Sequence, residues 1–198
     1  MAQLPQQTPQ LDAPGAGIPM HHRMLMRWYV RPRIAATSDW LHNEKLFYKI
    51  HGTILNEVSS VPYNKWSAKI LIPPQRGLED SSRFWNLKET LEHIVIVGSG
   101  IQSLVVTLSN GEVPASEVDT AKVKPAGQMT PEETLIYFEE YVTSCIGKIN
   151  AAKGEKLRQL KWPHPWFGPM NAHEWFWLLP IHAGLHLQQI REIKKKLG

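Results

Sequence analysis

Two histidines near the end of the chain, His182 and His186, are four residues apart. On a helix this spacing places both imidazoles one turn apart on the same face, with about 5–6 Å between their Cβ atoms. Two imidazoles at that separation are able to bind one metal ion. The pair also follows an apolar stripe, where a histidine needs a hydrogen-bond partner or a metal. The spacing predicts a metal site, and a satisfied pair of core histidines is an equally good interpretation.

A third histidine, His93, falls on another segment with helical periodicity. If the two helices are neighbours, three neutral imidazoles converge and leave an open position on Zn²⁺ or Ni²⁺, as in catalytic rather than structural sites. The motif is not that of the zincins, because His173-Glu174 begins like H-E-x-x-H but Trp177 stands where the second histidine would be. His173 is expected on the surface of a first helical turn.

Other chemistries have weaker support. Cys145 lies on an apolar stripe, which argues against a nucleophile. His42 and His51 are nine residues apart, too far around a helix to share a face, so surface or core-edge positions are expected. The sequence contains no Gly-rich phosphate loop, paired-carboxylate signature or nucleophile elbow. One cysteine and no secretory signal predict a cytoplasmic location.

Four segments with helical periodicity must position these histidines. Three of them begin with strong start signals: two Asn-x-x-Glu capping boxes, and a Thr followed by Pro and two Glu. Ser38 is expected to cap the first. The helices are predicted at residues 38–59, 86–110, 130–152 and 171–197.

The linkers between these helices are long, which is typical of functional loops. The 19 residues of 111–129 reach roughly 60 Å when extended. That exceeds the ~35 Å of a helix of about 23 residues, so the linker is able to cross over the bundle. No strand is convincing except Ala68–Ile72. The prediction is an all-α, up-down-down-up four-helix bundle with long crossover loops and an N-terminal arm.

The 198 residues divide into three parts. Residues 1–19 are rich in Pro and Gln and are predicted to be a disordered tail, 20–37 an N-terminal arm, and 38–198 the bundle domain. The composition, 42% hydrophobic and 20% charged, is that of a globular protein and excludes a disulfide scaffold. No membrane partner is expected. The net charge of +4 comes without a recognised DNA- or RNA-binding motif, so no nucleic-acid partner is expected.

At the histidines the sequence resembles the DinB-like superfamily of metal-dependent four-helix bundles, over residues 38–197. The resemblance depends on a histidine in the second helix, a His-Pro-x-x-Gly loop, and a His-x3-His pair in the fourth helix. The matching residues are Trp85-x5-Leu91-Glu92-His93, His164-Pro165-Trp166-Phe167-Gly168-Pro169, Glu174-Trp175 and His182-x3-His186-x2-Gln189-Ile190.

This resemblance implies a metal, usually zinc or nickel, held by His93, His182 and His186, and often a homodimer. Characterised relatives include transferases and isomerases that use low-molecular-weight thiols such as bacillithiol or mycothiol. Glu92 and Gln189 are then candidates for orienting the metal ligands. The loop residues Arg76, Arg83 and His164 are candidates for contacting an anionic substrate.

The function predicted on this basis is that of a metal-dependent transferase or hydrolase, which activates a thiol or water to act on a small-molecule substrate. The alternative is a non-catalytic bundle that binds a metal or a small ligand, with the basic arm serving a partner.

Overall fold

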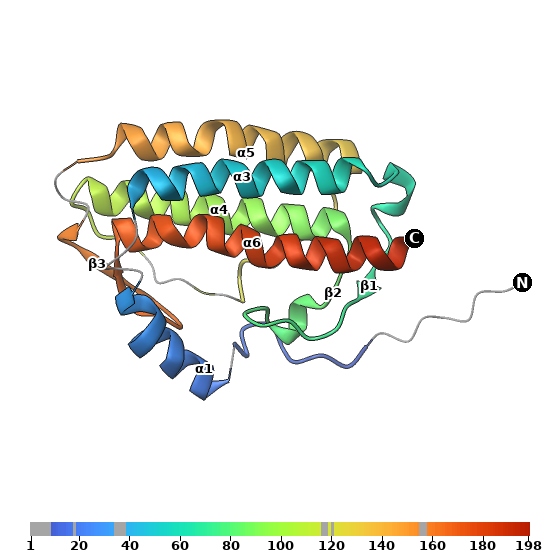
Figure 1. Ribbon diagram of the computed structural model, residues 1–198, viewed down its shortest axis with the longest axis horizontal. Coiled ribbons are helices and arrows are strands. Elements are labelled where there is room, and N and C mark those ends of the chain that lie inside the picture. The colour runs from blue at the N-terminus through green and yellow to red at the C-terminus, as the bar shows by residue number, and fades with distance from the viewer. Residues whose placement is uncertain (1–8, 18, 34–38, 116–118, 120, 155–157) are drawn as a thin grey trace, which may run out of the picture.

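The computed structural model of the chain describes residues 9–17, 19–33, 39–115, 119, 121–154 and 158–198. Four long helices lie side by side along its longest axis (Figure 1). Each begins and ends within two residues of its predicted segment. They are α3 (Trp40–Ser59), α4 (Leu87–Ser109), α5 (Pro131–Ala151) and α6 (Ala172–Leu197).

Three of the four helices begin as the sequence predicts, with complete capping boxes at Asn86, Thr130 and Asn171. In each box the cap side chain accepts the third N–H of the helix, and the glutamate there accepts the N–H of the cap residue. For the first helix, only the predicted N-cap residue is wrong. Helix α3 is capped by Asp39, whose carboxylate accepts the N–H of His42 at 3.1 Å, and Ser38 lies outside the described residues.

Contacts at the helix ends establish the helix directions. The ring of Trp40 packs on Phe176 near the start of α6, and Glu57 pairs with Arg191 near its end, so α3 and α6 run the same way. Trp40 also donates to Asn150 at the end of α5, so α5 runs the opposite way. Figure 1 shows α4 running with α5. The linker between α4 and α5 must therefore return along the length of the bundle.

Two short antiparallel sheets accompany the predicted helices. Strands β1 (Ile70–Leu71) and β2 (Phe84–Trp85) pair within the 60–85 linker, and β1 falls where the sequence suggested a strand. Strands β3 (Lys161–His164) and β4 (Gly168–Asn171) form a hairpin that the sequence placed in a linker. Each of these two strands contains a proline, which argues against a strand, but an isolated two-stranded ribbon uses few ladder N–H groups. The chain is thus mostly helical with two small sheets.

The segment before the bundle contacts the rest of the molecule through both the predicted tail and the arm. Within the predicted tail, the N–H of Asp12 donates to Asp80 at 3.0 Å. The arm is helical, first α1 (Met20–Leu25) and then the wider turn η1 (Met26–Val30), and it lies outside the bundle beside β3 (Figure 1).

Helix α4 is the one described helix that is long and apolar enough to cross a membrane by length and composition. Within the structure, however, 56% of its most apolar stretch is buried. Side chains such as Leu91, Ile94 and Val105 are almost completely inaccessible and belong to the main core. This burial is typical of the core helix of a bundle.

Replacing two glycines of α4 with alanine is expected to change the free energy of unfolding in opposite directions. A Cβ at Gly98 would collide with the hydroxyl of Tyr141 on α5, whereas a Cβ at Gly100 meets nothing within 4 Å. Gly98→Ala is therefore expected to lower the free energy of unfolding by about 1–3 kcal/mol through overpacking. Gly100→Ala is expected to raise it by about 0.5–1 kcal/mol, because alanine is the better helix former. Urea denaturation of both variants measures these changes, and equal effects would contradict the packing argument.

Candidate metal centre

The three predicted histidines converge between α4 and α6. One ring nitrogen from each of His93, His182 and His186 lies within 4.8 Å of the other two. The ring centroids are 5.2 Å apart for His93 and His182, 4.7 Å for His93 and His186, and 4.6 Å for His182 and His186. The three-histidine prediction assumed that the helix of His93 and the helix of His182 and His186 are neighbours, and α4 and α6 are neighbours in the structure.

Two of these imidazoles have their tautomer determined by a neighbouring oxygen. Nδ1 of His93 lies 2.7 Å from the carbonyl of Val123, which is only able to accept, so this nitrogen carries the proton. Nδ1 of His186 lies 2.7 Å from Oε1 of Gln189, and the amide is oriented because its nitrogen donates to the carbonyl of Ser82 at 2.7 Å. In both rings the lone pair is consequently on Nε2, the arrangement of metal-binding histidines.

The electrostatics of the cluster favour neutral imidazoles. Burial is the largest cause and lowers the pKa of His186 to about 4. The pKa values of His93 and His182 also lie well below the ordinary value, first through burial and then through repulsion from the neighbouring histidines. A neutral imidazole is the form that binds a metal. The cluster therefore requires no proton loss at neutral pH before it binds one.

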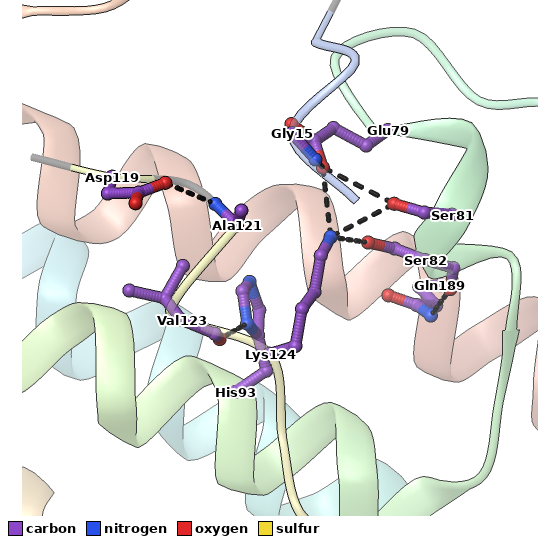
Figure 2. Close-up of polar contacts among 10 residues, drawn as sticks. All are labelled: Gly15, Glu79, Ser81, Ser82, His93, Asp119, Ala121, Val123, Lys124 and Gln189. Carbon is purple, nitrogen blue, oxygen red and sulfur yellow. Dashed lines mark hydrogen bonds and ion pairs between the residues drawn. The ribbon is translucent and has the colours of Figure 1, made fainter. Parts of the chain in front are cut away.

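The linker after α4 and the linker before it meet beside His93 (Figure 2). The ammonium of Lys124 donates to Glu79 at 2.9 Å, Ser81 at 3.0 Å and Ser82 at 3.2 Å. These contacts join the two linkers directly beside His93. No local pattern in the sequence singles out Lys124, because its partners are more than 40 residues away.

An aromatic side chain, Trp85, packs against two of the three histidines. The indole of Trp85 lies nearly parallel to the ring of His186, with centroids 6.1 Å apart, and at 4.9 Å from that of His93. Trp85 is 7% exposed, so its side chain shields the histidines from solvent on this side. Such shielding strengthens electrostatic interactions inside the site.

The residues predicted to assist the histidines are placed differently from one another. Gln189 orients His186 as described above. Glu92 instead accepts the N–H groups of Ala126 at 3.1 Å and Gly127 at 2.8 Å, so its carboxylate holds the linker. The group beside Nδ1 of His93 is the carbonyl of Val123, which the sequence did not single out.

The loop residues predicted to meet a substrate do not join the cluster. Nδ1 of His164 accepts the N–H groups of Trp166 at 3.0 Å and Phe167 at 3.3 Å, which closes the β3–β4 turn. Arg83 donates to the carbonyl of Ile72 at 3.0 Å. Arg76 is exposed on the 60–85 linker.

Two further histidines correct the sequence interpretation. His51 is completely buried rather than at the surface or the core edge, because its Nδ1 lies 2.8 Å from the carbonyl of Phe47 and its ring packs between Phe47 and Phe138. His173 is 5% exposed rather than a surface residue, because the ring of Trp40 covers the start of α6. Neither belongs to the three-histidine group.

The donor set of the cluster fits a borderline metal ion. Three neutral nitrogen ligands suit zinc, nickel and similar ions and leave at least one coordination position for a further ligand. The buried thiol of Cys145 is separate from this group, and burial raises its pKa to about 12, so it is protonated at neutral pH. The thiol of Cys145 is therefore excluded as the nucleophile of this site.

Comparison with known proteins gives one family. A family model described as the DinB superfamily matches residues 28–190, which include all three histidines and part of the arm. Neither the curated proteins nor the solved structures contain a match.

Proposed function

The chain belongs to the DinB superfamily, and we propose that it is a metal-dependent transferase or hydrolase with His93, His182 and His186 as the metal ligands. The proposed fold is the up-down-down-up four-helix bundle of that family. One observation carries the proposal: three neutral imidazoles, two of them buried and His182 partly buried, converge, and two have Nδ1 hydrogen-bonded so that Nε2 is available. Zinc and nickel are the ions we propose.

A divalent ion in this donor set supplies Lewis acidity, which lowers the pKa of a thiol or of water toward neutrality. The residues of the chain prepare the site for that chemistry. Gln189 and the carbonyl of Val123 hold two imidazoles in a single orientation. Trp85 excludes water from one side, and Lys124 contributes a positive charge that its contact with Glu79 partly balances.

The substrate we propose is a small molecule, with a low-molecular-weight thiol as the co-substrate for a transferase and water for a hydrolase. The alternative is a non-catalytic bundle that binds a metal or a small ligand. One observation favours it: among the described residues the group consists of histidines alone, with no carboxylate beside them to act as a base. A homodimer and a cytoplasmic location remain predictions.

Turnover in the presence and absence of metal tests the proposal. The purified protein is screened with low-molecular-weight thiols and electrophilic acceptors, and with ester and amide substrates. We expect an activity that a chelator removes and that Zn²⁺ or Ni²⁺ restores.

The matched control is Cys145→Ser, which should keep this activity because the buried thiol does not act as the nucleophile. A protein that binds stoichiometric metal but turns over none of these substrates would support the non-catalytic alternative instead.

A further inference from the structure

The N-terminal arm turns its apolar side toward solvent. Five large side chains of α1 and η1 are half or more exposed, or nearly so. They account for five of the twelve exposed large hydrophobic residues among the described parts of the chain. The five are Met20 (70%), Met24 (57%), Leu25 (49%), Trp28 (71%) and Tyr29 (54%).

Other side chains of the arm anchor it to the body, so this exposure follows from a defined orientation. Met26 packs against the main core. Nε of Arg31 donates to Glu174 at 3.1 Å, and the Glu174 side chain is 4% exposed. Arg27 lies against the β3–β4 turn, where a Cβ at Gly168 would be 3.2 Å from its Nε. An arm held by these contacts keeps Trp28 and its neighbours exposed to solvent.

The charged side chains of the arm segment itself have one sign. No aspartate or glutamate occurs between Asp12 and Asp39, whereas that stretch contains four arginines and two histidines. Arg27 lies over the ring of Trp28 at 5.7 Å, and Arg33 over that of Tyr29 at 3.4 Å. The aromatic rings and the cations are therefore interleaved on the same surface.

We propose that this arm face, Met20, Met24, Leu25, Trp28 and Tyr29, docks on the surface of an anionic phospholipid bilayer. Tryptophan and tyrosine prefer the level of the lipid headgroups, and methionine and leucine enter the adjacent acyl region. Arginines near an anionic surface add electrostatic attraction. This proposal differs from the expectation from sequence that the chain has no membrane partner, and it is independent of the proposed metal chemistry.

Lipid is favoured over a protein partner by the shape and composition of the face. A single short helix protruding from the bundle (Figure 1) is convex, and a convex helix enters a lipid surface without a matching groove. Its charge complements phosphatidylserine and does not complement a neutral headgroup.

Co-sedimentation with vesicles tests the proposal. The full chain is mixed with vesicles of phosphatidylcholine and phosphatidylserine, and separately with vesicles of phosphatidylcholine alone. We expect binding to the anionic vesicles and little to the neutral ones. M24E/W28E should reduce binding to the anionic vesicles about tenfold or more, because two carboxylates replace the inserted side chains.

The matched control is V113E/I136E, which makes the same charge change at two other exposed apolar positions, 61% and 56% exposed. It should bind as the wild type does. Circular dichroism and thermal unfolding confirm that both variants are folded. Failure of the wild type to bind anionic vesicles, or an equal loss in both variants, would overturn the proposal. So would a wild-type dimer that M24E/W28E converts to a monomer in sedimentation equilibrium, since a second copy would then cover the face.

Discussion

Replacing His182 and His186 together with alanine is expected to abolish metal binding while the helices remain folded. The wild type should carry a near-stoichiometric divalent metal, because three neutral imidazoles from two packed helices lie within 4.8 Å of one another. The double variant leaves His93 alone, and a single imidazole does not retain a metal through purification. Elemental mass spectrometry of tag-free protein, purified without added metal, measures the content.

The control for this experiment is H21A/H22A, which removes an exposed adjacent pair of histidines from the arm. It should keep the full metal content. Gln189→Leu should give an intermediate result, with metal affinity about 10–100-fold lower, because it removes the acceptor of the His186 Nδ1 proton. A wild type that takes up neither Zn²⁺ nor Ni²⁺ on incubation would eliminate the metal centre.

Lowering the pH is expected to destabilise the protein through His51. Burial lowers the pKa of this imidazole to about 4 in the folded chain, against 6.5 for an unperturbed histidine. Between these two values the unfolded chain binds more protons, so the contribution is complete above pH 6.5 and is lost as the pH falls toward 4. A shift of this size corresponds to about 3 kcal/mol.

Comparison of the wild type with His51→Phe isolates this contribution. Phenylalanine has a similar ring and does not titrate, so the variant should lose about 3 kcal/mol less than the wild type between pH 6.5 and 4. Urea denaturation of metal-free protein across that range measures the difference. His42→Phe changes an exposed histidine on the same helix and should follow the wild type. Parallel curves for H51F and the wild type would refute the argument.

The helices could be predicted from the sequence because their signals are local. The capping boxes at Asn86, Thr130 and Asn171 involve residues three apart, and each is formed in the structure. The apolar periodicity that follows each cap also lies within one helix. The cap of α3 was missed because Ser38 and Asp39 are adjacent and both suit the position.

The β3–β4 hairpin was missed for a related reason. Pro163 and Pro169 lie opposite each other in its register, and two prolines argue against a strand when each segment is considered alone. The acceptance of two turn N–H groups by His164 stabilises the hairpin. That contact could not be predicted from the sequence, because it depends on the turn that forms when the two strands pair.

For the metal centre, the sequence by itself determined that His182 and His186 share one face of one helix, because a four-residue spacing has that consequence in any α-helix. Only the tertiary structure decided that His93 joins them, since this depends on α4 packing against α6. It also decided that the carbonyl of Val123 is the partner of His93, that Glu92 binds the linker, and that His51 is buried. These outcomes depend on contacts between segments distant in the chain, and no local pattern encodes which segments will meet.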